Sequence, residues 1–473
     1  MRQFPNLPIR VVCFAGLLVL AGCKVGPKYV RPQVPDPPAF RGPDDAATSS
    51  AAKDSLGDQQ WSQVFKEPEL QALITQALAN NYDLRIAAQR VLEQQAQVKI
   101  TRAQQFPTLS AGGSGAGADI PSIGSLGGNN ISNPIVFGGF NLSAAWTPDF
   151  WGLYRRQTEA ARNTLLAQQW AQKAVRLTLV EQVASTYFSL RALDAQLAIA
   201  EQTVKSRQDS VDLTRRLADG GSAPLSDLRQ AEQLLYTATS QIPQLKQQIQ
   251  QDENALKLLV GDVPGAVTHA DPTALVPPPT ALPVGLPSQL LERRPDIQQA
   301  EAQLMAANAN IGVARAQFFP QLSISGSGGV GGDSFPDMFK SGAETVYGIG
   351  SLTQPIFAGG KLRGQLQLSE ETKKEMVLNY QKTIITAFRD VSNALIAADK
   401  QRAYREQQEK LVAAAEDATR LARIRYQGGA TAYLEVLTTD TNLFTAQLNL
   451  AIAQQNEALA LVQLYAALGG GWQ

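Results

Sequence analysis

An internal duplication is the feature that most constrains how this chain can fold. Residues 102–110, RAQQFPTLS, are matched by residues 315–323, RAQFFPQLS. A second match lies further along each half, where a Gly-Gly pair precedes an acidic residue at the same spacing. Because both matches are offset by about 210 residues, the two halves carry the same parts in the same order. The sequence therefore predicts two copies of one structural unit.

The repeated parts divide the chain. Each half has a short helical lead-in, a Gly- and Ser-rich strand region and two long helices that meet at a Gly-Gly turn. We expect the first repeat to span residues 61–262 and the second residues 288–473. A Pro-rich linker, residues 263–287, joins them.

Apolar residues recur at alternating steps of three and four through both expected helical hairpins, residues 152–261 and 359–467, which is typical of coiled-coil seams. The polar exceptions are Asp252 in the first seam and Thr441 and Gln455 in the second. The first seam comprises Leu228, Ala231, Leu235, Ala238, Ile242, Leu245, Ile249, Asp252, Leu256 and Leu259. The second comprises Leu434, Leu437, Thr441, Phe444, Leu448, Ala451, Gln455, Ala458, Val462 and Tyr465. Helices of this length reach about 100 Å, and we expect Pro243 to kink one of them or remove a hydrogen bond. A plain coiled coil without a channel is the alternative.

Four strands are predicted, at about residues 108–119, 136–150, 321–332 and 345–357. Apolar side chains alternate with small or polar ones there, as in Phe140, Leu142 and Trp146. This period of two fits a strand with lipid on one face and water on the other, although a half-buried soluble sheet has the same pattern. Four strands cannot close a membrane barrel, and eight are filled by their own side chains. Three copies, giving about twelve strands, would leave a pore and no edge exposed to lipid.

The first residues have the features of a lipoprotein signal peptide, residues 1–22. Arg2 and Arg10 precede a short apolar run that is too short to span a membrane. The run ends in Leu20-Ala21-Gly22-Cys23, which looks like a bacterial lipobox. We expect cleavage before Cys23, with a diacylglycerol on its sulfur and an acyl chain on its new amino group; an ordinary signal peptide with an incidental cysteine is the alternative. Residues 23–60 would form a lipid-anchored, extended N-terminal segment.

Composition argues against several classes of protein. There are 42 Lys and Arg residues against 42 Asp and Glu, so no excess of positive charge supports nucleic-acid binding. With two cysteines and the single histidine His269, the chain offers no zinc site or disulfide framework. It also shows no nucleophile–base set and no phosphate-binding loop. We therefore predict no catalytic residues, no metal and no cofactor beyond the lipid.

With these features in place, nearly the whole mature chain closely resembles the outer-membrane efflux proteins of the TolC type, in particular the NodT/OprM-like lipoproteins. Four stretches carry the resemblance. They are residues 23–32 (CKVGPKYVRP), residues 61–81, residues 293–297 (RRPDI) and residues 468–472 (LGGGW). Each is weak alone, but their order along a duplicated chain is specific.

The resemblance implies an α+β membrane protein of the Gram-negative outer membrane. It implies a homotrimer whose 12-stranded β-barrel continues into a long periplasmic α-helical coiled-coil barrel. The partners implied are a periplasmic adaptor protein and an inner-membrane transporter of the resistance-nodulation-division class. The chain would then be a gated, passive conduit for drugs or other small molecules, with no chemistry of its own.

Candidate functional residues follow from the same resemblance. The hairpin tips, Gly220-Gly221 and Gly428-Gly429, need backbone freedom for a tight turn and would meet the adaptor; purely structural turns are the alternative. The periplasmic gate is expected just beyond the second tip. There Leu434 matches a hydrophobic constriction, Glu435 matches an acidic position, and Thr438 stands where relatives carry Asp. Three Glu435 side chains in a narrow ring would repel one another and attract cations, unless Glu435 is simply a solvated carboxylate at a helix end. Asp440 is nearby but faces another direction.

Two other functions remain possible from the sequence. A TolC-like channel for type I protein secretion would have the same barrel and tunnel. A structural coiled-coil lipoprotein or a periplasmic adaptor belongs to a different class, and it would carry a single hairpin rather than a full duplication with paired strand regions.

Overall fold

The computed structural model describes residues 24–34, 39–43, 47–48, 55–118, 135–268, 283, 285 and 287–472. Its residues form two compact units, and each unit takes segments from both repeats. We call the first the sheet unit (Met1–Pro32, Val91–Ala167 and Ala300–Tyr380) and the second the hairpin unit (Gln33–Arg90, Gln168–Gln299 and Gln381–Gln473). The repeats are therefore not separate compact bodies, because equivalent parts of both combine in each unit.

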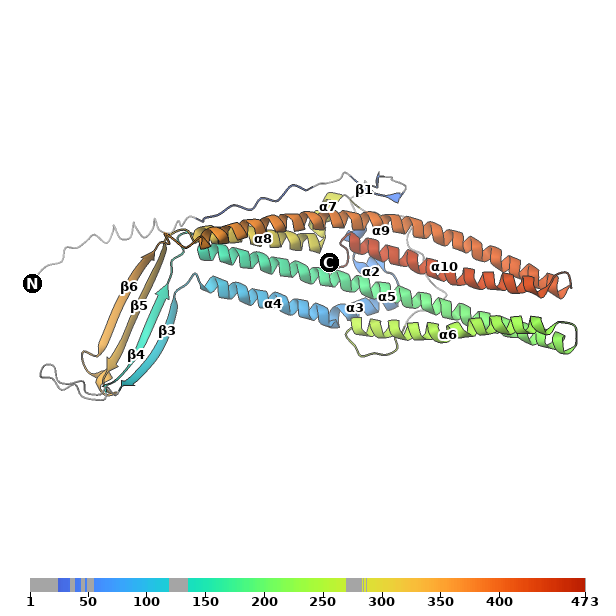
Figure 1. Cartoon of the computed structure of the whole chain (residues 1–473), viewed down its shortest axis with the longest axis horizontal. Coiled ribbons are helices and arrows are strands. Elements are labelled where there is room, and N and C mark those ends of the chain that lie inside the picture. The colour runs from blue at the N-terminus through green and yellow to red at the C-terminus, as the bar shows by residue number, and fades with distance from the viewer. Residues whose placement is uncertain are drawn as a thin grey trace, which may run out of the picture. The chain divides into compact units, whose positions relative to one another are not determined.

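The sheet unit contains four antiparallel strands in the order β3-β4-β5-β6 (Figure 1). The strands are β3 (Thr108–Ala118), β4 (Ile135–Trp146), β5 (Gln321–Gly332) and β6 (Glu344–Thr353). Strands β4 and β6 end four residues before the predicted ends. In each case a proline, Pro148 or Pro355, stands two residues beyond the last strand residue, and a proline cannot donate a ladder hydrogen bond.

Strands from the two repeats meet in the middle of this sheet, where Phe140 of β4 lies opposite Val330 of β5. The outer strands β3 and β6 have no further strand partner among the described residues. Large apolar side chains are exposed at one position of β3 and at several positions of β6. Leu109 of β3 is 69% exposed, and Val346 and Leu352 of β6 are 87% and 70% exposed. The isolated chain thus presents two open sheet edges, with exposed apolar side chains concentrated on β6.

Two long helical hairpins follow the strands. Helices α5 (Leu153–Asp219) and α9 (Lys361–Gln427) each have 67 residues, and α6 (Leu225–Leu259) and α10 (Tyr433–Ala467) each have 35. In the hairpin unit, α6 runs back beside α5 and α10 runs back beside α9 (Figure 1). Helix α6 continues through Pro243, which lacks the N–H that a helix interior uses. Corresponding helices of the two repeats therefore have the same number of residues.

The predicted seams form the core of the hairpin unit near the tips. Leu228, Ala231 and Leu235 of α6 are buried in one cluster with Val436 and Leu437 of α10. A second cluster includes Ala238, Leu245 and Phe444. The expected start of the second seam was wrong, because Leu434 is 64% exposed. Tyr433 is buried in its place.

Shorter elements complete the two units. The lead-in of the first repeat contains η2 (Leu56–Asp58), α2 (Trp61–Val64), α3 (Pro68–Asn80) and α4 (Tyr82–Ala103). That of the second contains α7 (Pro287–Arg293) and α8 (Pro295–Ala316). The remaining elements are β1 (Phe40–Arg41), β2 (Ala47–Thr48) and η3 (Asp337–Phe339). Of the helices that the structure describes, none combines the length and apolar character needed to cross a membrane.

Candidate channel gate and anchor sites

The two hairpin tips have the same backbone geometry. Gly221 and Gly429 both have φ of +69°, a conformation that favours glycine. In the first tip, the Ser222 N–H donates to the Leu217 carbonyl at 2.8 Å, and in the second the Ala430 N–H donates to the Arg425 carbonyl at 2.8 Å. These bonds satisfy carbonyls at the ends of α5 and α9. The glycines are thus explained as turns, and adaptor docking at the tips stays a prediction.

The predicted gate residues lie in the first turns of α10 but point in different directions. Leu434 and Thr438 are one helical turn apart, and the Thr438 hydroxyl donates to the Leu434 carbonyl at 2.8 Å. Glu435 instead accepts a hydrogen bond at 2.8 Å from Arg425 of α9, and a second from Thr431. Its charge is therefore offset by a cation of the same hairpin, which the expectation of a bare acidic ring did not include.

A charged network that the sequence analysis missed lies one turn further into the hairpin unit. The Asp440 carboxylate of α10 accepts from Arg207 of α5 at 2.9 Å and from Arg423 of α9 at 3.0 Å. Arg207 also donates to the Leu234 carbonyl of α6 at 2.7 Å. The Arg207 side chain is 3% exposed and that of Asp440 is 12% exposed. One carboxylate thus connects both hairpins in a desolvated setting.

The internal repeat contains a spacing from which the Arg423–Asp440 pair of this network could have been predicted. Arg423 and Asp440 are separated by 17 residues across the second tip, and Arg215 and Glu232 are separated by 17 residues across the first. Each arginine donates to its carboxylate. Arg207 has no such signal, because the equivalent residue of the second repeat is Ala415.

The described residues contain no group of three or more His, Cys, Asp or Glu side chains that could hold a metal ion. A cavity of about 710 Å³ lies within the hairpin unit between α5, α9 and α10. Its charged residues include Glu181, whose pKa is raised by burial and lowered by Arg294 to a smaller extent. Arg294 in turn binds Asp296 at 2.6 Å and the Ala467 carbonyl at 3.2 Å, so the RRPDI stretch has a structural role here.

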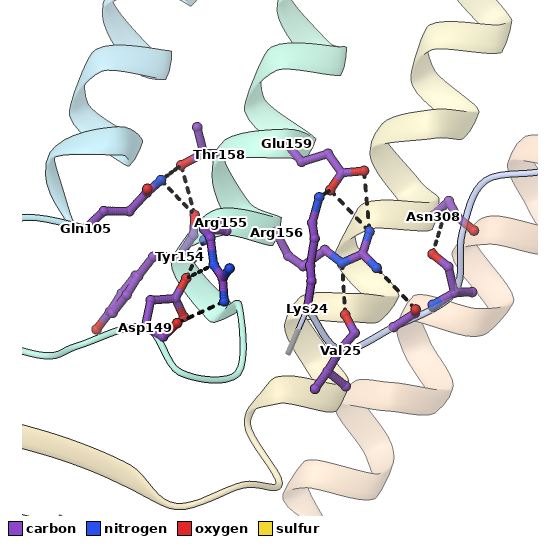
Figure 2. A network of polar contacts seen from close by, with 12 residues as sticks. Lys24, Val25, Gln105, Asp149, Tyr154, Arg155, Arg156, Thr158, Glu159 and Asn308 are labelled. Atoms are coloured by element: carbon purple, nitrogen blue, oxygen red, sulfur yellow. Dashed lines mark hydrogen bonds and ion pairs between the residues drawn. The ribbon is translucent and has the colours of Figure 1, made fainter. Parts of the chain in front are cut away.

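The expected lipid-bearing residue, Cys23, lies outside the described residues. The chain that follows it, Lys24–Arg31, packs against α5 and α8 in the sheet unit (Figure 2). Arg156 of α5 donates to the carbonyls of Val25 at 2.8 Å and Gly26 at 3.1 Å. Glu159 of α5 forms ion pairs with both Lys24 and Arg156.

Comparison with known proteins decides between the functional classes. The sequence model of the outer membrane efflux protein family matches two stretches of this chain, residues 73–262 and residues 286–470. The chain belongs to this family. The two matched stretches correspond to the two repeats, with the Pro-rich linker between them.

Curated relatives and solved structures agree with this assignment. The chain is 35% identical over 470 residues to the cation efflux system protein CusC of Escherichia coli O6:H1, covering 98% of this chain and 99% of CusC. It is 37% identical over 481 residues to the solvent efflux pump outer membrane protein SrpC of Pseudomonas putida, covering 99% of each. The crystal structure of the open state of the Neisseria gonorrhoeae MtrE outer membrane channel matches with a TM-score of 0.85 at 30% identity, covering 95% of this chain and 99% of MtrE.

This membership confirms the predicted fold, location and general function. The chain is an outer-membrane channel component of an efflux system, and it has the TolC-like fold of that family. The family consists of channels rather than enzymes. A structural coiled-coil lipoprotein and an adaptor, the alternatives from another class, are not supported.

Proposed function

We propose that three copies of this chain close into one passive efflux duct, with a barrel of twelve strands and a tunnel of twelve helical segments. The observation that carries the proposal is the four-stranded sheet with two open edges. Unpaired N–H and C=O groups at a sheet edge are costly in lipid, so spanning sheets must close. Four strands are too few to close around a pore, and edge-to-edge pairing of β3 with β6 of the next copy removes both edges.

Exposed apolar residues on the helices of the sheet unit support the same assembly. Leu92 and Ile100 of α4 are 54% and 62% exposed, and Leu368 and Leu378 of α9 are 67% and 66% exposed. Exposed apolar side chains that form a contiguous patch mark a surface that a partner covers. A neighbouring copy would bury them together with the sheet edges.

We further propose that the tips at Gly220-Gly221 and Gly428-Gly429 meet a periplasmic adaptor protein, which couples the duct to a resistance-nodulation-division transporter in the inner membrane. The tips are suited to docking because a side chain placed at Gly221 or Gly429 would meet nothing within 4 Å. The gate would be formed by Leu434, Glu435 and Thr438, with the Asp440 network holding the two hairpins together behind it. The chain itself would perform no catalysis.

The names of the relatives support a cargo of small size. These proteins serve efflux of cations, solvents, toluene and antibiotics. We propose that this chain likewise conducts small molecules and not unfolded proteins. A channel for type I protein secretion is the alternative. Lipid attached at Cys23 would hold the duct in the outer membrane together with the barrel.

The test is complementation in a Gram-negative strain that lacks its own outer-membrane channels. The chain is expressed with the adaptor and pump genes that neighbour it, and steady-state accumulation of a fluorescent efflux substrate is measured. Deletion of residues 428–434 and the Cys23→Ala variant serve as comparisons. We expect the chain to lower accumulation and the tip deletion to abolish that effect, with native mass spectrometry showing a trimer.

Accumulation that stays unchanged while the trimer is present in the outer membrane would contradict efflux of that substrate by that pump. A monomer or dimer in native mass spectrometry would contradict the twelve-stranded assembly. Secretion of a co-expressed protein substrate without any change in dye accumulation would favour the type I alternative.

A further inference from the structure

The segment Lys24–Arg31 lies in a site formed by α5 and α8 of the sheet unit, and Figure 2 shows the contacts at the start of the segment. The site binds main-chain atoms. Arg156 donates to two successive carbonyls, Asn308 of α8 donates to the Pro27 carbonyl at 3.2 Å, and the Val25 N–H donates to the Trp151 carbonyl at 3.2 Å. Main-chain contacts at three successive residues, 25 to 27, fix the register of the segment along the site.

Glycines bring the segment into close contact with both helices. Gly26 has φ of +111°, and a Cβ atom there would lie 2.5 Å from the Cα of Gly312 in α8. A Cβ atom on Gly312 would lie 2.7 Å from Nε of Arg156. A side chain at Gly26 would clash with the backbone of α8, and one at Gly312 would displace the Arg156 side chain from its place on the segment. The segment, α8 and Arg156 therefore fit together in this arrangement because both positions are glycine.

Charge holds the two ends of the segment. At its start, Glu159 is shared between Lys24 and Arg156, whose side chain is 6% exposed. At its end, Glu301 of α8, with a side chain 8% exposed, accepts from Arg31 at 2.5 Å and from the Tyr29 hydroxyl at 3.1 Å. Hydrogen bonds in which a partner is charged are stronger than those between neutral groups. The segment is therefore held at both ends and in its middle.

The site begins one residue after the expected point of lipid attachment. A single peptide link, about 4 Å between successive Cα atoms, joins Lys24 to Cys23. Any acyl chains on Cys23 would be tied directly to a site on the folded sheet unit, without the slack that a flexible linker provides.

We propose that Arg156, Glu159, Gly26 and Gly312 form a docking site for the mature N-terminus, which fixes the lipid-bearing residue at one place on the sheet unit. This inference rests on the lipid attachment in the proposed function. Arg156 acts as a positioning residue for the anchor. The lipid then works as a rigid attachment of the sheet unit to the bilayer and not as a loose tether.

Four variants separate positioning of the lipid-bearing residue from its mere attachment. Arg156→Ala removes the docking bonds. Insertion of Gly-Ser-Gly-Ser after Lys24 keeps the lipid and the docking of Val25–Arg31 but adds slack between them. Arg162→Ala is the matched control, since Arg162 is an exposed arginine of the same helix and has no hydrogen-bond or ion-pair partner among the described residues. Arg156→Lys keeps the positive charge but not the planar fork that reaches two carbonyls.

Two measurements are made on full-length trimers from outer membranes. The first is tryptic release of the N-terminal peptide, read by mass spectrometry, which also reports the acyl chains on Cys23. We expect Arg156→Ala to speed release by about tenfold or more, because lost bonds to a charged group favour local opening. Arg156→Lys should lie in between, and Arg162→Ala should match the original chain.

The second measurement is the amount of trimer assembled in the outer membrane at equal expression. We expect the insertion and Arg156→Ala to lower it alike. An insertion that leaves assembly unchanged while Arg156→Ala lowers it would show a purely structural role for Arg156 and overturn the proposal, as would unchanged tryptic release in Arg156→Ala. Absence of acyl chains on Cys23 in the original chain would instead contradict the lipid anchor, and it is read directly from the peptide mass, independently of efflux.

Discussion

The two hairpin tips are near copies, and their main difference is a connection from the second hairpin to the first. Both hairpins have helices of 67 and 35 residues, a glycine at φ of +69° and an arginine–carboxylate pair across the tip. In the first hairpin, Arg215 pairs with Glu232 inside that hairpin. In the second, Asp440 pairs with Arg423 and also with Arg207 of the other hairpin. The duplication therefore supplies the bridge within each hairpin. Between the hairpins, Arg207 supplies the ion pair to Asp440, and Arg423 also donates to the Ser206 hydroxyl of α5 at 2.9 Å.

The largest effect should come from removing the shared carboxylate. Asp440→Ala leaves Arg207, which is 3% exposed, without its charge partner, and such a broken buried pair typically costs about 3–5 kcal/mol. We expect hydrogen exchange to show a loss of protection in all four helices near the tips. Glu232→Ala is the matched control and should lose far less, since Arg215 and Arg229 are 51% and 68% exposed. Equal losses of hydrogen-exchange protection in the two variants would contradict the difference between the two carboxylates. If Asp440→Ala does not fold, Asp440→Asn replaces it.

The second prediction concerns the Arg207–Asp440 ion pair between the hairpins. Arg207→Ala removes the bond to Asp440, the bond to the Leu234 carbonyl and a guanidinium that lies 4.9 Å from the centre of the Phe444 ring. Hydrogen bonds of charged groups contribute about 1.5–3 kcal/mol. We expect higher conductance or more frequent opening in planar bilayers, whereas Arg215→Ala, which leaves the hairpins joined, should behave as the original chain does. Unchanged conductance in Arg207→Ala would show that the Arg207–Asp440 ion pair has no role in gating.

The sequence predicts the structural features that occur in both repeats. The strands, both hairpins, the glycine turns and most of the seams follow from periodicity and composition. The pairing of Arg207 with Asp440 does not, because it joins residues that are 233 apart and has no counterpart at Ala415. Local spacing also places Leu434 in the seam, and only packing against α5 and α6 shows that Tyr433 is buried instead. The docking of the N-terminal segment was likewise missed, since it depends on contacts across the whole chain.

The third prediction concerns the glycine turns, which should respond alike in the two tips. Gly221→Ala and Gly429→Ala place a side chain at φ of +69° with nothing nearby to obstruct it, so the cost is that of the backbone alone, about 1–2 kcal/mol. We expect equal increases in protease cleavage at the two tips. Gly220→Ala and Gly428→Ala lack that positive φ and should cost less. A clearly larger loss at one tip would show that the turns are not equivalent.

The smallest effect concerns Glu435, whose pairing with Arg425 has no equivalent in the first hairpin, where Leu217 replaces the arginine. Both side chains are partly exposed, and such pairs contribute about 0.2–1 kcal/mol, so Glu435→Gln should barely change stability. Ion selectivity in bilayers is the sharper measurement. If Arg425 offsets the acidic charge, Glu435→Gln should shift permeability towards anions, Arg425→Gln should shift it towards cations, and the double variant should return to the original value. If instead three Glu435 side chains act as a bare ring, Arg425→Gln will change nothing and Glu435→Gln will remove cation preference in both backgrounds, because the arginine would then have no part in the field at the gate.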